Sequence, residues 1–227
     1  MPLLPTLLLV LAGSAPDGGV EPAWEESTTA DDVTVFRRAT PGSPIKSVKG
    51  TGVVDAPPQR VALVLVDDDR APEWVDSLAE AKVLEQLSPT EYLEYNHASM
   101  PLIVSDRDFV TRVTMSVDSS TGVVTMVSRP AETPLAPERA GVVRGVLSAR
   151  YIIEPVGASS SRLTVEIHTD PRGSLPAWVV NFFQKDWARE TIAGIRKQAA
   201  KKDLTPPPPF AAFLGQIGTS TRDAGAP

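Results

Sequence analysis

The hydrophobic pattern of the chain changes its period near residue 170, and this change limits the possible folds more than any other feature. Before it, several short runs alternate apolar and polar residues, as in SDRDFVTRVTMSV at 105–117, which is typical of strands with one buried face. After it, residues 170–202 repeat their apolar positions at helical spacing. Strands followed by one long amphipathic helix predict an α+β domain, in which an antiparallel sheet packs around that helix.

The predicted strands are bounded by Gly, Pro, Ser and Asp residues, which favour turns. They cover 33–40, 45–54, 80–87, 91–100, 105–117, 122–129, 142–156 and 161–169. In the strand at 105–117, alternation places Phe109, Val113 and Met115 on one face, and we expect this face to point inward. Residues 55–75 are ambiguous, because their β-branched content favours a strand whereas their early prolines and acidic end allow a helix.

Composition excludes several functional classes. The chain has 227 residues, of which 42% are hydrophobic, so it can bury a substantial core. The net charge of −6 argues against a nucleic-acid partner and against strong binding to anionic membranes through overall charge. There is no cysteine, which excludes disulfides, thiolate metal sites and a cysteine nucleophile.

The two ends of the chain suggest processing and a tail. Residues 3–12 form a short apolar run, and Ala12 and Ser14 fit a signal-peptide cleavage site before Ala15. We expect a signal peptide at 1–14, a flexible segment at 15–23, the folded domain at 24–204 and a Pro-rich tail at 205–227. The protein would then be exported to the periplasm or the extracellular space. The alternative is a frayed apolar N-terminus on a cytosolic protein.

The sequence offers little material for catalysis or metal binding. His97 and His168 are the only histidines, and the chain contains no G-x-S-x-G, H-E-x-x-H or P-loop pattern. Two histidines without a nearby acidic cluster are a poor zinc site. The acidic run VDDDR at 66–70 is interpreted as a solvated helix end. We therefore expect no catalytic residue, no metal and no cofactor.

Several segments occur together in the order and spacing of a known family. They are Trp24, APPQRVALVLVDDDRAPEWV, PLIVSDRDFV, PLAPERAGVVR and HTDPRGSLPAWVVN. In this combination, residues 24–204 resemble START domains, the steroidogenic-acute-regulatory-related lipid-transfer family, of a bacterial exported type. The resemblance implies a helix-grip fold, in which a curved antiparallel sheet wraps a long C-terminal helix and encloses a hydrophobic tunnel. It also favours a helix in the ambiguous segment at 55–75.

The resemblance implies a monomeric, non-enzymatic carrier of one hydrophobic lipid, of the sterol or phospholipid class. Its partners would be the lipid and, transiently, a membrane, but no nucleic acid. The gate would be the loop at 131–141, with Pro134, Leu135 and Pro137, closing against the helix that begins near Leu175. The residues expected to line the lipid are Phe109, Val113, Met115, Val143, Leu147, Tyr151, Leu163, Val165, Ile167, Val179, Phe182 and Phe183.

One departure from the family concerns the tunnel. Several members place an acid and an arginine inside it, and here Glu94 stands near the acid position while Val113 stands at the arginine position. Arg112 is one residue away and should point to the other face, because strand side chains alternate. A lone buried Glu94 would be unfavourable. It therefore points outward, binds another donor such as Arg144, or does not occupy that position.

Two other functions stay open. The same general scaffold can host an enzyme, such as a cyclase or hydrolase acting on a hydrophobic small molecule. An enzyme should place two or more titratable groups together in the cavity, whereas a carrier should have few. A weaker possibility is that the prolines at 206–209 recruit a partner protein.

Overall fold

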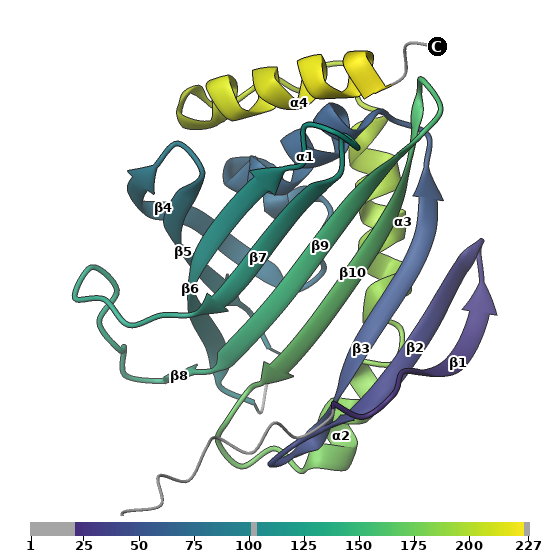
Figure 1. The fold of residues 1–227 in the computed structure, drawn as a ribbon. Coiled ribbons are helices and arrows are strands. Elements are labelled where there is room, and N and C mark those ends of the chain that lie inside the picture. Colours follow the sequence, from purple (N-terminus) through teal and green to yellow (C-terminus); the bar gives the residue numbers. More distant parts are fainter. Residues whose placement is uncertain (1–20, 101–103, 225–227) are drawn as a thin grey trace, which may run out of the picture.

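The sheet forms the largest part of the computed structural model, which describes residues 21–100 and 104–224. In this part of the chain, ten strands make one sheet, and nine of them follow the order β1-β2-β3-β10-β9-β7-β6-β5-β4 (Figure 1). Adjacent strands in this order are antiparallel, while β8 pairs in parallel with β6. The strands are β1 (Glu25–Ala30), β2 (Val33–Thr40), β3 (Ser43–Val54), β4 (Leu78–Ser88), β5 (Glu91–Ala98), β6 (Asp106–Val117), β7 (Val124–Pro130), β8 (Val142–Arg144), β9 (Val146–Val156) and β10 (Ser160–Asp170).

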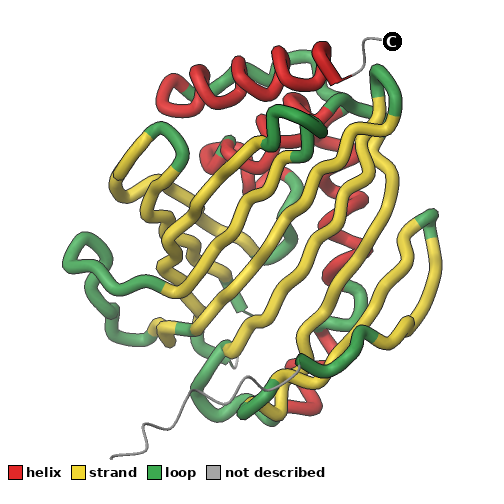
Figure 2. Tube along the Cα trace, viewed as in Figure 1, coloured by secondary structure: helices red, strands yellow, loops and turns green. Residues whose placement is uncertain are grey.

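The helices lie on one face of the curved sheet and across one of its ends (Figure 2). They are α1 (Pro58–Val66), α2 (Ala177–Phe183), α3 (Trp187–Ala199) and α4 (Ala211–Ala224), with 3₁₀ helices η1 (Asp68–Glu73) and η2 (Pro208–Phe210). This arrangement confirms the predicted α+β helix-grip fold, with a curved antiparallel sheet around C-terminal helices. It also confirms that residues 58–66 are helical. No helix in the described ranges is long and apolar enough to cross a membrane.

The strand register places apolar residues of neighbouring strands side by side on the inner face of the sheet. Directly paired residues lie on the same face of an antiparallel sheet. Starting from Met115, successive cross-strand partners are Met126, Tyr151, Val165, Gly50 and Val35. Helix α3 packs on this face so closely that a Cβ atom at Gly50 would lie 2.7 Å from the Cβ atom of Ala188. The sheet and α3 therefore share one hydrophobic core.

The single long helix predicted from residue 175 is wrong in its continuity, because a turn at 184–186 divides it into α2 and α3. The polar sequence Gln184-Lys185-Asp186 interrupts the apolar stripe. Asn181 also ties α2 to the start of β3. Its Oδ1 accepts a hydrogen bond from the Lys46 amide at 2.9 Å, and its Nδ2 donates to the Pro44 carbonyl at 3.2 Å.

Helix α4 is the main element that the sequence did not predict. Residues 205–227 were expected to form a Pro-rich, weakly apolar tail, yet Phe213, Leu214 and Ile217 of α4 are buried in the core. Phe210, just before α4, places its ring 4.9 Å from that of Tyr92. Helix α4 packs on α1 and covers one end of the sheet (Figure 1). The described part of this segment is therefore integral to the fold.

Smaller departures concern the edges of the sheet. Strand β1 lies in the predicted folded domain at 24–204 but was not among the predicted strands, and the strand predicted at 142–156 is split at Gly145. A Cβ atom at Gly145 would lie 2.3 Å from Cε1 of Phe109, so only glycine fits beside that ring. The predicted signal peptide at 1–14 and most of the predicted flexible segment at 15–23 lie outside the described residues.

Candidate ligand-binding interior

Glu94 points to the inner face of the sheet. In the β5–β6 register, Tyr92 pairs with Val113, and Glu94 pairs with Thr111. Val113 belongs to the buried core, and residues two apart on a strand share a face. Glu94 therefore enters the interior together with Tyr92, at the acid position that the family resemblance suggested.

The partners of Glu94 inside the protein are neutral. Thr111 Oγ1 donates a hydrogen bond to Glu94 Oε2 at 3.0 Å, and the Asn96 side chain also bonds to this carboxyl group. The suggested partner Arg144 is wrong, because its Nε and Nη2 donate to the two oxygens of the buried Asp108 at 2.7 and 3.0 Å. Burial is the dominant influence on Glu94 and raises its pKa.

Asp68 lies in the same interior region, which the sequence interpretation missed. The run at 66–70 was expected to be solvated, but the Asp68 side chain is only 7% exposed. Its Oδ2 atom is buried without a hydrogen-bond partner among the described residues. Burial, and after it the nearby Glu94 carboxylate, raise the pKa of Asp68 to about 9. Two interacting buried carboxyl groups do not both ionise readily, so this pair retains a proton at neutral pH.

Two tyrosines lie close to the carboxyl pair. Burial raises the pKa of Tyr92, and the charges of Glu94 and Asp68 raise it further. Burial followed by the charge of Glu94 likewise raises the pKa of Tyr151. The four side chains come from η1, β5 and β9, so three separate elements bring their polar groups into one region of the core.

Several inner residues keep accessible surface although they lie deep in the protein. Burial raises the pKa of both Glu94 and Tyr151, yet part of each residue's surface is accessible. The same holds for Trp74, Val117 and Leu147, which pack against the hydrophobic core while remaining partly accessible. These inner-face side chains therefore keep accessible surface in a region that is otherwise strongly buried.

The predicted lining residues of the strands fall into partly accessible and buried positions. Leu147 and Tyr151 lie on the inner face and are partly accessible, whereas Phe109 is buried against Gly145. Val143 is half-buried on the short strand β8, next to Arg107 in register. The remaining predicted strand residues are fully buried in the core, and they are Val113, Met115, Leu163, Val165 and Ile167.

The predicted lining residues of α2 lie elsewhere. The Phe182 side chain is 56% exposed, and the Lys185 ammonium lies 4.4 Å from the centre of its ring. Val179 is half-buried, and its neighbour Val180 is buried instead. The Phe183 side chain lies outside the described part of the structure. Placing Phe182 toward the interior was therefore wrong, because the break after α2 turns this short helix away from the stripe of α3.

The predicted gate loop is anchored at its middle. Pro134, Leu135 and Pro137 are exposed, but Ala136 between them is buried against Tyr95 and Val110. Both contacts come from the outer face of the sheet, since they alternate with inner residues of β5 and β6. Arg144 Nη2 also donates to the Ala136 carbonyl at 3.0 Å. Movement of this loop remains a prediction.

Both histidines lie on the outer face of the sheet. His97 pairs in register with Asp108, and its Nε2 lies 3.0 Å from Asp106 Oδ2. His168 pairs with Ser148, one position from the inner residue Leu147, and its Nδ1 lies 3.3 Å from Thr40 Oγ1. Across the described residues, no three potential metal ligands of the His, Cys, Asp or Glu type come together.

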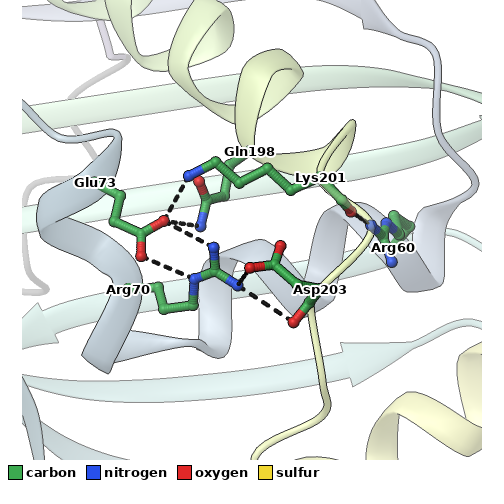
Figure 3. Close-up of polar contacts among 6 residues, drawn as sticks. All are labelled: Arg60, Arg70, Glu73, Gln198, Lys201 and Asp203. Atoms are coloured by element: carbon green, nitrogen blue, oxygen red, sulfur yellow. Dashed lines mark hydrogen bonds and ion pairs between the residues drawn. The ribbon is translucent and has the colours of Figure 1, made fainter.

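A polar network fixes η1, which carries Asp68, to the end of α3 (Figure 3). Arg70 binds both oxygens of Glu73 at 3.0 Å, and Glu73 Oε2 also accepts from Gln198 Nε2 at 3.1 Å and from Lys201 Nζ at 2.5 Å. These bonds, that of Arg70 first, lower the pKa of Glu73 to about 2. Arg70 also pairs with Asp203 at 3.2 Å. The network holds the backbone on which Asp68 stands.

Comparison with known proteins relates the chain to lipid-transfer proteins. The model of the START domain family matches residues 18–199. An uncharacterised protein of Pseudomonas aeruginosa is 27% identical over 180 residues, covering 79% of this chain and 88% of that protein. Human StAR-related lipid transfer protein 13 is 33% identical over 175 residues, which are 76% of this chain but only 15% of the human protein.

Solved structures agree with the fold. A fragment of a STAR-related lipid transfer protein from Xanthomonas axonopodis superposes with a TM-score of 0.70 at 26% identity, covering 78% of this chain and 99% of that fragment. Human STARD10 superposes with a TM-score of 0.73 at 22% identity, covering 90% of this chain and 82% of that structure. The second likeness concerns the fold alone.

Proposed function

Because the chain belongs to the START domain family, we propose that it binds one hydrophobic lipid between the sheet and its helices and carries it unchanged. The observation that carries the proposal is the apolar inner face of the sheet, on which Leu147 and Tyr151 keep accessible surface. The human relative and the Xanthomonas structure are both named as lipid transfer proteins, which supports the same function.

The energetics of burial suit such a carrier. Burying apolar ligand surface gains roughly 25 cal/mol per Å² before the entropic costs of binding. A sterol-sized or phospholipid-sized ligand can therefore bind with micromolar or tighter affinity without an ion pair. Val113, at the position where some relatives place a tunnel arginine, is fully buried in the core and keeps this part of the interior apolar.

We place lipid uptake at the end of the sheet where β7 and β10 finish. The loop at 131–141 leaves β7 there, and α2 follows β10 at the same end (Figure 1). The most exposed large apolar side chains described are Trp178 at 73%, Phe182 at 56% and Leu135 at 52%, all on these two segments. Aromatic residues suit the membrane interface, so this end supports transient membrane contact and gating.

Export is a separate proposal, based on the apolar run at 3–12 and the small residues Ala12 and Ser14. The intact mass of the protein from the periplasm or medium of its native host should correspond to a chain that begins at or near Ala15. Full-length chain recovered from the cytosol alone would contradict export.

The direct test of the carrier function is native mass spectrometry of the purified chain, followed by solvent extraction and identification of the bound molecule. One lipid per chain is the expected result. A protein that purifies empty and takes up no sterol, phospholipid or fatty alcohol from vesicles would refute the proposal.

A second candidate is an enzyme acting on a hydrophobic small molecule, because Asp68, Glu94, Tyr92 and Tyr151 bring several titratable groups into the interior. Incubation with the identified ligand distinguishes the two functions. A carrier returns the molecule unaltered. A product that forms with the native chain, and not with a variant carrying Glu94→Gln, would favour the enzyme.

A further inference from the structure

Helix α4 lies beyond the part of the chain that matches the family. The START model ends at residue 199, whereas α4 spans Ala211–Ala224. Phe213, Leu214 and Ile217 of α4 nevertheless belong to the same hydrophobic core as the inner residues of the sheet. This chain therefore adds an element of its own to the core of the domain, and the shared fold does not explain what that element does.

Anchors on both sides of a proline-rich connection hold α4 in place. The Arg60 guanidinium donates hydrogen bonds to two carbonyl groups at the end of α3, one of them that of Ala199 at 2.9 Å. Leu204 and Phe210 are buried at the two ends of the connection. The four prolines between them restrict its backbone. Helix α4 therefore has a defined position and lacks the freedom of a tail.

That position is the end of the sheet opposite the proposed site of lipid uptake. Helix α4 crosses one end of the sheet, while α2 and the loop at 131–141 lie at the other end (Figure 1). The ring of Phe210 lies 4.9 Å from that of Tyr92, which is opposite Val113 in register and shares its inner face. The segment that leads into α4 therefore contacts the inner face directly.

The packing of the inner face differs between its two ends. On β9, Leu147 and Tyr151 keep accessible surface, whereas Ile153, nearer to α4, is fully buried. Leu147 and Ile153 are about 20 Å apart along the strand. The side chains gathered at the α4 end are each at most 1% exposed, and they are Tyr92, Ile153, Phe210, Phe213, Leu214 and Ile217. A long ligand that enters at the uptake end therefore meets solid packing at α4.

We propose that α4 is the closed end of the lipid site and that Phe210 and Phe213 set the greatest tail length that this chain accepts. Each methylene group buried against the inner face adds to affinity. A tail that reaches the two rings gains nothing from further methylene groups, because the packed core has no room for them. The inference rests on the proposed lipid-binding function, and it makes these two phenylalanines the residues that determine specificity for tail length.

The first test locates the end of a bound tail in the native, full-length protein. The probe is hexadecanoic acid with a diazirine group at the terminal carbon of its tail, which bonds covalently to neighbouring residues on irradiation. Peptide mass spectrometry then identifies the labelled residues, which we expect within 204–217. The same acid with the diazirine next to its carboxyl group is the control, and it should label residues outside this segment.

The second test measures the limiting tail length. Fatty acids and lysophosphatidylcholines with tails of 12 to 22 carbons are offered in phosphatidylcholine vesicles, and native mass spectrometry measures the amount bound. Phe210→Ala removes one ring at the closed end. Phe36→Ala makes the same change on the outer face of β2, where Phe36 pairs in register with Lys49, and is the matched control. Circular dichroism checks that both variants are folded.

Binding by the native protein should vary within about threefold up to the limiting length, because the vesicle buries the same methylene groups. Beyond that length it should fall at least tenfold. Phe210→Ala should raise binding of the shortest excluded tail at least fivefold, which corresponds to burial of about one more methylene group. Phe36→Ala should keep the native limit.

Equal binding of all tail lengths would overturn the inference. So would an unchanged limit in folded Phe210→Ala, or terminal-diazirine labels confined to α2 and the loop at 131–141. If Phe210→Ala does not fold, the labelled position in the native protein decides alone. These outcomes leave lipid binding itself intact. Failure of the native protein to bind a probe of any length or polar end would instead refute the proposed function, and this inference with it.

Discussion

At the scale of single residues, Asp68 shows how burial can reverse an interpretation based on local sequence. Three consecutive acids normally indicate solvent, yet Asp68 is buried beside Glu94. A signal was present, because the preceding run VALVLV is apolar on all sides and therefore predicts a helix buried all round. The residues just after such a helix begin deep in the protein. By contrast, the family resemblance placed Glu94 near the acid position but left its direction open, and the β5–β6 register shows that it points inward.

Asp68→Asn should stabilise the protein in a pH-dependent way. The pKa of Asp68 is about 9 in the folded protein against an ordinary value of 3.8, so between these values the folded chain binds a proton that the unfolded chain releases. The stability contributed by this group is therefore complete below pH 3.8 and is lost as pH rises toward 9. The variant should gain on the order of 1–3 kcal/mol at pH 8 and little at pH 4.

Urea unfolding at the two pH values measures this difference, with Asp69→Asn as the exposed control. Equal stability changes at pH 4 and pH 8, or a loss of stability at pH 8, would show that Asp68 is ionised in the folded protein.

At the scale of elements, the strands were predicted more accurately than the boundaries of the C-terminal helices. Alternation located most strands, because a two-residue period survives in short segments. The break between α2 and α3 was missed because Trp178 and Phe182 continue the apolar stripe that α3 buries, although both are exposed. Helix α4 was missed because the prolines before it and its own small residues resemble a linker, whereas its buried face depends on contact with the distant helix α1.

Phe213→Ala tests whether α4 is integral to the domain. The Phe213 side chain is fully buried in the core, so its truncation should lower the free energy of unfolding by about 3–5 kcal/mol. Chemical denaturation provides the measurement, and the exposed Ala212, changed to Ser, is the control. A loss below about 0.5 kcal/mol would mean that α4 behaves as an appended tail.

A pair of glycine substitutions tests the close packing of α3 on the sheet. In Gly50→Ala the new Cβ atom would meet the Cβ atom of Ala188 at 2.7 Å, so α3 must shift, at a cost of about 1–3 kcal/mol. In Gly215→Ala, at an exposed position of α4, nothing lies within 4 Å of the new Cβ atom, and the better helix former should add up to about 1 kcal/mol. The midpoint temperature of thermal unfolding should therefore fall in Gly50→Ala and rise in Gly215→Ala. Shifts of the same sign in both variants would contradict the close packing of α3 on the sheet.

At the scale of the whole molecule, the proposed ligand site and the proposed membrane contact occupy different regions. The carboxyl pair lies in the core, whereas Leu135, Trp178 and Phe182 expose their side chains on the loop at 131–141 and on α2. The two activities should therefore respond separately to substitution. The sequence does not distinguish the exposed aromatic residues from the buried ones, because both kinds occur at the apolar positions of the same helical pattern.

Trp178→Ser combined with Phe182→Ser should slow lipid transfer between vesicles at least fivefold, since less apolar surface can enter the membrane interface. Affinity for a lipid in solution should stay unchanged. A stopped-flow transfer assay with a fluorescent lipid measures the first quantity, and Val53→Ser combined with Val156→Ser removes exposed apolar side chains elsewhere as the control. Equal transfer rates for both pairs would contradict membrane docking at this end.

The central claim is that the lipid occupies the space inside the sheet, and filling that space tests it most directly. Leu147 is partly accessible on the inner face, so Leu147→Trp should fill the space, while Leu87→Trp places the same side chain at an exposed position on β4. Native mass spectrometry of the folded variants counts bound lipid. We predict one lipid per chain for the native protein and for Leu87→Trp, and at least a tenfold loss of occupancy for Leu147→Trp. Full occupancy in folded Leu147→Trp would contradict an internal lipid site.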